Sequence, residues 1–266
     1  MPNTDLGADL ERRFSGLRRL YGDAAYERLR GAHFAVAGLG GVGSWAVEAL
    51  ARTGVARLTL IDFDQVAESN INRQIQALGS TVGLSKGEAL KQRIADIHPG
   101  CEVRFIEEFV SEENWPDLLD GGAPLDGLID ACDQVRAKAA MAAWSRTAGA
   151  PVFCTVGAAG GKRLPHALEV EDLALTTHDP LLASLRQRLR KQYAAPRQGK
   201  IGVACVYSRE AVQRPRAEEG EACEVVAVDG TLNCAGYGSS VMVTAAFGMA
   251  AAAELTRLFL KLAKKK

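Results

Sequence analysis

The glycines in residues 38–44, GLGGVGS, are spaced in a way that suits phosphate binding. Gly38, Gly40 and Gly43 form G-x-G-x-x-G after the apolar run HFAVA and before residues with helical spacing. Glycines in such a turn let phosphates approach backbone amides at the positive end of a helix. Asp62, nineteen residues after Gly43, ends the next apolar run, where its carboxylate can accept hydrogen bonds from ribose hydroxyls. The spacing predicts a nucleotide site without distinguishing NAD from ATP.

Charged residues further along the chain separate these two nucleotides. ATP brings a triphosphate that needs several cations and usually magnesium, whereas NAD brings a pyrophosphate and a neutral nicotinamide. Arg73 in SNINRQ and Lys86 in GLSKGEA both follow Asp62 and can reach a polyphosphate. Asp130 ends the run LDGLID, at the sheet edge where open α/β folds bind ligands, and a carboxylate there suits magnesium. Taken singly, Arg73 could be part of a surface ion pair, Lys86 a solvated helix residue and Asp130 a helix cap. Together, in this order after one glycine loop, they favour ATP.

The elements that must position these residues alternate in type along the chain. Apolar runs predict strands and helical spacing predicts helices; the strands are expected at 33–37, 57–62, 102–107, 125–130 and 151–155, and the helices at 42–53, 86–97 and 134–148. This order predicts an α/β fold, a Rossmann-like and mainly parallel sheet with helices on both faces.

The alternation changes after Gly161. A strand ALEVEDL, a basic helix at 181–193, a strand GVACVYS, an acidic loop at 214–224 and a long C-terminal helix follow. We expect an N-terminal helix and nucleotide-binding core over 1–161. A C-terminal lobe over 162–266 is expected to complete the same single domain.

Composition limits the partners and the location of the chain. Lys and Arg number 32, as do Asp and Glu, so no whole-molecule field draws the protein onto nucleic acid or an anionic membrane. The first residues lack the apolar core of a signal peptide, and we expect a cytoplasmic protein. The apolar stretch 237–255 approaches the length of a membrane span, but most of its apolar mass is alanine, which favours a buried helix.

Together the motifs resemble a known family. GLGGVGS, LIDFDQVAESNINRQ, the helix start at Lys86 and LIDACD are similar to the adenylating domain of ubiquitin-activating enzymes and their bacterial relatives in thiamine and molybdopterin synthesis. RRFSGLRRLYG, TVGAAGG, GKIGVACVYS and NCAGYGSS narrow the resemblance to the tRNA threonylcarbamoyladenosine dehydratases, over nearly the whole chain. The resemblance implies ATP-dependent cyclisation, with loss of water, of the threonylcarbamoyl group on adenosine 37 of tRNA.

The resemblance also assigns roles to residues. Asp62 is expected to hold the ribose, Arg73 and Lys86 the phosphates, and Asp130 the magnesium, so that Arg73, Lys86 and Asp130 form the catalytic group. Asn70 and Gln74 are expected to position the triphosphate or its loop. The expected nucleotide-binding set is completed by Gly38, Gly40, Gly41, Gly43, Asp64 and Arg13.

Partners are implied in the same way. The family is dimeric, and Arg13 matches an arginine that relatives donate to the nucleotide of the partner subunit, although RRF departs from the usual pattern. A cysteine desulfurase and its sulfur acceptor are linked to the family, and Cys205 or Cys234 could serve them or be small buried residues. The six cysteines form no CxxC pair, so we expect reduced thiols and no zinc. A monovalent cation is left open.

A cluster of cations predicts where tRNA binds. Residues 186–200 contain no acid and six basic side chains, Arg186, Arg188, Arg190, Lys191, Arg197 and Lys200. We expect this patch, with Arg186 and Arg190 foremost, to contact the RNA backbone, and Lys162 and Arg163 to lie nearer the site. The alternative is a solvated helix face.

Three other functions remain open from the sequence. An adenylyltransferase that activates the C-terminus of a ubiquitin-like or sulfur-carrier protein would use the same ATP site. A NAD-dependent dehydrogenase would explain the stretch from Gly38 to Asp62 but leave Arg73, Lys86 and Asp130 without a role. A nucleotide-sensing scaffold would keep the pocket without catalysing a reaction.

Overall fold

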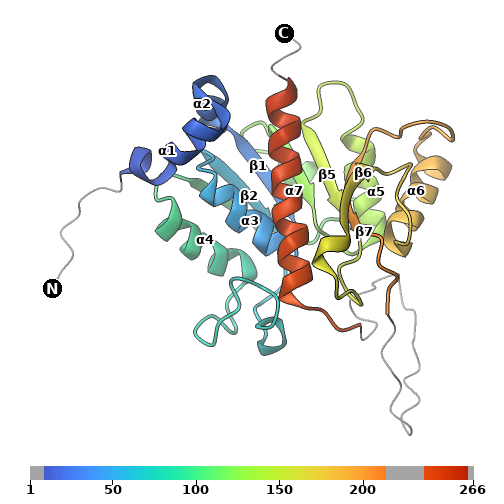
Figure 1. Ribbon diagram of the computed structural model, residues 1–266, viewed down its shortest axis with the longest axis horizontal. Helices are drawn as coiled ribbons and strands as arrows, with labels where there is room; N and C mark the ends of the chain where they lie inside the picture. Colours follow the sequence, from blue (N-terminus) through green and yellow to red (C-terminus); the bar gives the residue numbers. More distant parts are fainter. Residues whose placement is uncertain (1–8, 214–236, 263–266) are drawn as a thin grey trace, which may run out of the picture.

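The described residues, 9–213 and 237–262 of a computed structural model, contain one seven-stranded sheet (Figure 1). Its strands lie in the order β3-β2-β1-β4-β5-β7-β6. Their bounds are β1 His33–Ala37, β2 Arg57–Ile61, β3 Glu102–Ile106, β4 Gly127–Asp130, β5 Val152–Val156, β6 Leu168–Asp172 and β7 Ala204–Ser208. Neighbouring strands are parallel except β6 and β7, which are antiparallel. The predicted α/β fold with a mainly parallel sheet is confirmed, with strand ends shifted by one or two residues.

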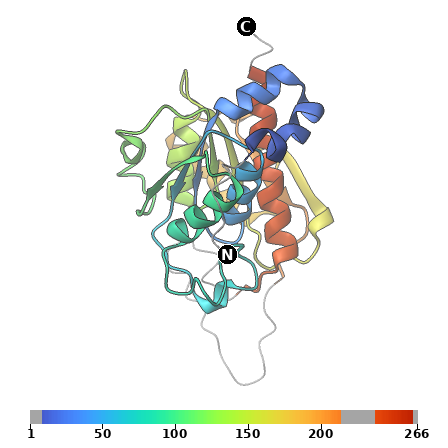
Figure 2. The ribbon, with the colours of Figure 1, turned by 90° about the vertical axis from the view of Figure 1, so that its left-hand side faces the viewer.

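Helices cover both faces of the sheet, as the alternation predicts (Figure 2). Those of the described residues are α1 Leu10–Tyr21, α2 Asp23–Gly31, α3 Gly43–Arg52, α4 Lys86–Ile97, α5 Val135–Trp144, α6 Pro180–Gln192 and α7 Val241–Leu262, with short 3-10 turns at Glu68–Asn70, Asp117–Leu119 and Pro165–Ala167. In β1, Phe34 and Val36 pack with α3, α4 and α7, whereas Ala35 and Ala37 pack with α5 and α6. Successive strand residues point to opposite faces, so each strand contributes to two cores.

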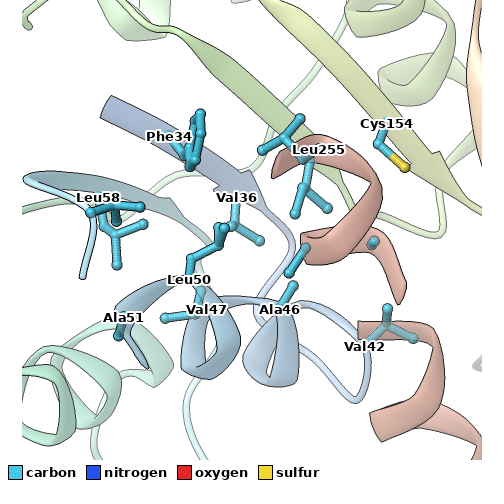
Figure 3. Close-up of a cluster of buried hydrophobic side chains, with 14 of the residues drawn as sticks. Phe34, Val36, Val42, Ala46, Val47, Leu50, Ala51, Leu58, Cys154 and Leu255 are labelled. Atoms are coloured by element: carbon cyan, nitrogen blue, oxygen red, sulfur yellow. The ribbon is translucent and has the colours of Figure 1, made fainter. Parts of the chain in front are cut away.

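The larger core lies between α3, α7 and the sheet (Figure 3). Val47 and Leu50 of α3 lie against Val36 of β1, and Leu255 of α7 closes the cluster from the other side. All four side chains are fully buried. Burial of an aliphatic side chain of this size contributes roughly 1.5–3 kcal/mol, so this packing fixes α3 and the loop that precedes it.

Strands from both parts of the chain belong to one sheet. β7 pairs with β5, and β6 pairs with β7. The segment after Gly161 therefore extends the sheet of the nucleotide-binding core through backbone hydrogen bonds. The acidic loop predicted at 214–224 lies outside the described residues.

The apolar C-terminal stretch forms α7, which begins at Val241 and ends at Leu262, rather than spanning 237–255. Within the described residues it is the one helix whose length and composition would allow it to cross a membrane. Its side chains Val243, Phe247 and Leu255 are buried against the sheet and α3. An added Cβ at Gly248 would overlap the carbonyl oxygen of Val42, so α7 lies close against α3 because position 248 has no side chain.

This contact gives a stability prediction. We expect Gly248→Ala to cost about 1–3 kcal/mol of unfolding free energy, because its Cβ would also lie 2.7 Å from the Cβ of Trp45 and force the two helices apart. Gly16→Ala is the control, since Gly16 is exposed on α1 with only Arg19 within 4 Å, and it is expected to gain up to about 1 kcal/mol. Denaturant unfolding measures both; an undiminished stability of Gly248→Ala would contradict the close packing.

Candidate nucleotide-binding site

Three loops meet at the carboxyl edge of the sheet. β1 lies between β2 and β4, and Ala37 at its end is in register with Ile61 on one side and Asp130 on the other. The glycine loop that follows β1 is therefore flanked by the loop that starts at Asp62 and by the loop that follows Asp130. This edge, outside the carboxyl ends of the strands, is where ligands bind in open α/β sheets.

The glycines allow the first loop to approach its neighbours closely. Gly38 has φ +85°, and a Cβ there would lie 2.8 Å from the backbone of Ala131 in the loop after β4. A Cβ at Gly43 would overlap the carbonyl oxygen of Gly38. Apart from its two chain neighbours, no described residue has an atom within 4 Å of a Cβ built on Gly40, so that position faces open space in the described structure. Two glycines thus form the turn, and the third leaves room for a ligand.

The loops enclose a cavity of about 300 Å³, near the lower end of the range for ligand pockets. It brings together nine of the twelve residues expected to bind the nucleotide or metal. These are Gly38, Gly40, Gly41, Asp62, Asp64, Asn70, Arg73, Gln74 and Lys86. Gly43, Arg13 and Asp130 do not line it.

Lys86 is the buried cation of the cavity. It opens α4, where a positive charge opposes the helix dipole, and its Nζ lies 2.6 Å from Asp64 and 4.0 Å from Asp62. The backbone amides of Leu39 and Asp64 donate hydrogen bonds to the Asp62 carboxylate. Burial raises the pKa of Asp62, and the charge of Lys86 opposes that rise. The two acids hold Lys86 beside the glycine loop.

Arg73 lies on the segment that closes the cavity. One of its guanidinium nitrogens donates to the carbonyl of Ser69 and to the side chain of Asn72. Its own carbonyl accepts hydrogen bonds from Trp45 of α3, at 3.0 Å, and from Thr244 of α7, at 3.3 Å. The backbone of Arg73 is thereby tied to two helices, while its side chain lines the cavity.

Asn70 and Gln74 are buried residues of the same segment. The Asn70 side chain accepts from the amide of Ala67 at 3.2 Å, and Gln74 accepts from Gln76 at 3.1 Å. These bonds suit the expected role of shaping the loop around the phosphates.

The position of Asp130 requires a correction. Its carboxylate has no exposed surface and accepts hydrogen bonds from Lys138 at 3.0 Å, from Thr155 at 2.6 Å and from the amide of Cys132 at 3.1 Å. The ion pair with Lys138 of α5 lies beneath the cavity. Both oxygens are occupied, so the geometry does not fit the expected magnesium ligand or a catalytic group in contact with substrate.

Asp133 is the carboxylate that the sequence reasoning missed. It lies three residues further on, in the loop before α5, and lines both the main cavity and a smaller adjoining one of about 70 Å³. In the described part of the chain, the side-chain hydrogen bond and ion pair of this region are formed with Asp130 rather than with Asp133. The signal was present as the second acid of the motif LIDACD.

Arg13 lies away from this chain's own cavity. Its guanidinium donates to the carbonyls of Asp96 and Ile97, at 2.8 and 2.7 Å, and so caps the C-terminal end of α4. It lines a separate hollow between α1 and α4. Its expected contact with a partner's nucleotide stays a prediction.

Two of the cations expected to bind tRNA make hydrogen bonds within the chain, and for the buried Lys162 this is a second correction, whereas Arg186 also lines a surface groove. Lys162 is buried and donates to the carbonyls of Ser208 and Glu210; burial lowers its pKa. One nitrogen of Arg186 donates to Leu173 and Thr176. Arg163 is exposed.

Three of the remaining cations of the basic segment line a groove, whereas Lys200 is exposed and does not line it. Arg190, Lys191 and Arg197 line it together with Arg186, and its volume is about 630 Å³. Among residues 9–213 and 237–262, no carboxylate lines this groove. Arg188 points elsewhere and pairs with Glu112 at 2.8 Å.

Cys205 is a buried residue of β7, and burial raises the pKa of its thiol well above the usual value. It therefore lacks the exposed thiolate that a nucleophile or sulfur carrier needs. Cys234 lies outside the described residues. Within 9–213 and 237–262, no group of three or more His, Cys, Asp or Glu could hold a metal ion by itself.

Comparison with known proteins finds relatives that match nearly the whole chain. The tRNA threonylcarbamoyladenosine dehydratase of Escherichia coli (strain K12) is 44% identical over 95% of this chain and 96% of its own length. The dehydratase of the same name from Haemophilus influenzae is 43% identical over 96% of this chain and 95% of its own. A crystal structure of the Escherichia coli enzyme in complex with ATP matches with a TM-score of 0.85 and 40% identity, covering 97% of this chain and 98% of that one. The model of the ThiF family matches residues 12–266, and the chain belongs to this family.

Proposed function

We propose that this chain catalyses the ATP-dependent cyclisation, with loss of water, of the threonylcarbamoyl group on adenosine 37 of tRNA. The observation that carries the proposal is the cavity in which Arg73 and Lys86 converge with the glycine loop and Asp62. The similarity to dehydratases of this activity, over nearly the whole of both chains, supports it.

The chemistry explains why ATP is needed. A carboxylate loses oxide very poorly in water. When its oxygen attacks the α-phosphorus of ATP, pyrophosphate leaves, and the AMP now bound to the carboxylate is a stable leaving group that ring closure expels. Gly40 leaves room for the phosphates at the start of α3, and Arg73 and Lys86 stabilise the charge that develops on them. Asp62 holds the ribose. The ureido group of the same substrate then closes the ring, and its proximity supplies an effective molarity on the order of 10⁵ M or more, so no nucleophile of the enzyme is required.

Magnesium, which we propose accompanies ATP, is assigned to Asp133 rather than Asp130. Mg²⁺ is usually bound by one or two carboxylates together with substrate phosphates. Asp133 lines the cavity and is free of other partners in the described residues, whereas Asp130 is held by Lys138. One carboxylate beside the phosphates is a sufficient protein contribution.

We also propose a cytoplasmic homodimer, as in the family that the motifs resemble. Arg13 is at the surface of α1, where a partner subunit could reach it. A link to a cysteine desulfurase through Cys205 is not favoured, because that thiol is fully buried.

The tRNA is held, in this proposal, along the groove of α6. Cations that line one groove without a carboxylate repel one another, and a polyanion relieves that repulsion. Leu181, at the start of α6, lines the small cavity beside the nucleotide site. Arg190 follows nine residues later, about 14 Å along the helix, so one RNA arm could contact the groove and reach the site.

The main alternative is adenylation of the C-terminus of a ubiquitin-like or sulfur-carrier protein. Incubation with ATP, magnesium and either modified or unmodified tRNA distinguishes the two. We expect the modified nucleoside to lose the mass of one water, with AMP release only in its presence. AMP release that does not depend on tRNA but requires a carrier protein would overturn the proposed function. In a separate incubation with NADH, consumption of this reduced cofactor would indicate a dehydrogenase.

Lys86→Ala is expected to lower turnover about 10²- to 10³-fold, because it removes a cation that stabilises the charge developing on the phosphates during adenylyl transfer. Lys91→Ala is the control, since Lys91 lies on the same helix but is exposed and pairs with Glu88. Initial rates of AMP formation measure the effect. Near-normal ATP consumption by Lys86→Ala would contradict its assigned role.

Asp133→Asn and Asp130→Asn should separate chemistry from stability. Asp133→Asn is expected to reduce activity and to require more magnesium, with unfolding free energy changed by no more than about 0.5 kcal/mol. Asp130→Asn leaves the buried Lys138 without its counter-charge and should cost about 3–5 kcal/mol of stability. Magnesium titrations and denaturant unfolding are the measurements. Unaltered magnesium dependence in Asp133→Asn would remove Asp133 from the metal site.

The groove predicts a change in the salt dependence of RNA binding. Replacing Lys191 and Arg197 with Gln should weaken tRNA binding and flatten the slope of log affinity against log salt by about 0.7–0.9 for each phosphate that the protein no longer neutralises. The control replaces Lys91 and Arg57 with Gln. It removes the same two positive charges, but from residues that pair with Glu88 and Glu102. If both double variants behave alike, the groove is only a solvated surface.

A further inference from the structure

Two phenylalanines at the nucleotide site are exposed. Phe63 is 55% exposed and Phe109 is 53% exposed. The other six phenylalanines of the chain, which all lie in the described residues, are buried or partly buried. The exposed phenylalanines are therefore confined to one place, where Phe63 and Phe109 lie next to each other.

The pair lies at the edge of the nucleotide cavity. Phe63 follows Asp62 directly, and Phe109 lies in the segment after β3. The ring centroids are 5.1 Å apart and the planes are tilted by 46°. Phe109 lines the cavity, whereas Phe63 does not. Phe109 thus borders the cavity directly, and Phe63 lies beside it, outside the cavity lining.

Core packing does not account for this arrangement, because both residues are more than half exposed. Exposed aromatic rings beside a nucleotide site are suited to stacking on a nucleobase. Two sources of a base exist at this site, the adenine of ATP and an unpaired base of the RNA. The adenine would lie inside the cavity, on the side of Phe109.

We propose that Phe63 stacks on an unpaired base of the tRNA loop that carries the modified adenosine, with Phe109 supporting its ring from the cavity side. The proposal rests on the proposed function, since the RNA must bring its reacting group to this cavity. Stacking on a phenyl ring tolerates any base, because every base has a π face. Phe63 therefore adds affinity for an opened loop rather than for a sequence.

The test is a binding cycle with a modified anticodon stem-loop RNA. Phe63→Ala is expected to weaken binding about 5- to 150-fold, the range for one base–aromatic stack. Phe63→Trp should retain the affinity, and Phe63→Leu, which stays apolar but has no π face, should lose most of it. KM for ATP and the thermal midpoint should not change in any of these variants.

Stem-loops with a single abasic loop position identify the base. At one position the abasic RNA should bind wild type as weakly as the intact RNA binds Phe63→Ala, and the two changes together should cost no more than either alone. The inference is overturned by unaltered RNA affinity in Phe63→Ala, by full affinity in Phe63→Leu, by additive losses at every position, or by a raised KM for ATP alone. Cyclisation by the wild-type protein is measured separately, and its absence would reject the proposed function instead.

Discussion

The buried ion pair between Asp130 and Lys138 fixes the edge of the sheet on which the site depends. Neither side chain has any exposed surface, and Thr155 of β5 joins the same carboxylate. Separating buried charges of this kind costs several kcal/mol, so α5 is held to the ends of β4 and β5. The short connection between the pair is thereby constrained. It presents Asp133 to the cavity and packs Ala131 against the glycine loop.

The charged residues around Lys86, which line the cavity, are arranged differently from this buried pair. Lys86 has two acidic neighbours, of which Asp62 is buried and held by backbone amides, whereas Asp64 has about half of its side chain exposed. Asp64 makes the shorter contact with Lys86, at 2.6 Å, but is open to solvent, whereas the buried Asp62 lies 4.0 Å away. Phosphates that approach Lys86 therefore compete with a solvated carboxylate rather than with a buried one, which is the less costly exchange.

The sequence predicts most of this site because its signals are local. The turn glycines, Asp62 at a strand end and Lys86 at a helix start follow from spacing along the chain. Asp130 and Asp133 could not be separated in that way, since both belong to one motif and only the partner Lys138 decides which is buried. Basic residues gave the same difficulty. The buried Lys162 donates hydrogen bonds to carbonyls that lie 46 and 48 residues further along the chain. The pattern of charges in the sequence does not predict such a contact.

The contact between Thr244 of α7 and the carbonyl of Arg73 spans 171 residues of chain. The methyl group of Thr244 also lies against Gly41, because a Cβ built on Gly41 would be 3.1 Å from that methyl carbon. During synthesis the glycine loop leaves the ribosome long before α7 does. The nascent chain can form β1, β2 and α3 early, and Trp45 of α3 can then bind the carbonyl of Arg73, but the second hydrogen bond to that carbonyl waits for Thr244 of α7. Full support of the segment that carries Arg73 thus depends on a late helix from which, in the described residues, no charged side chain lines the cavity.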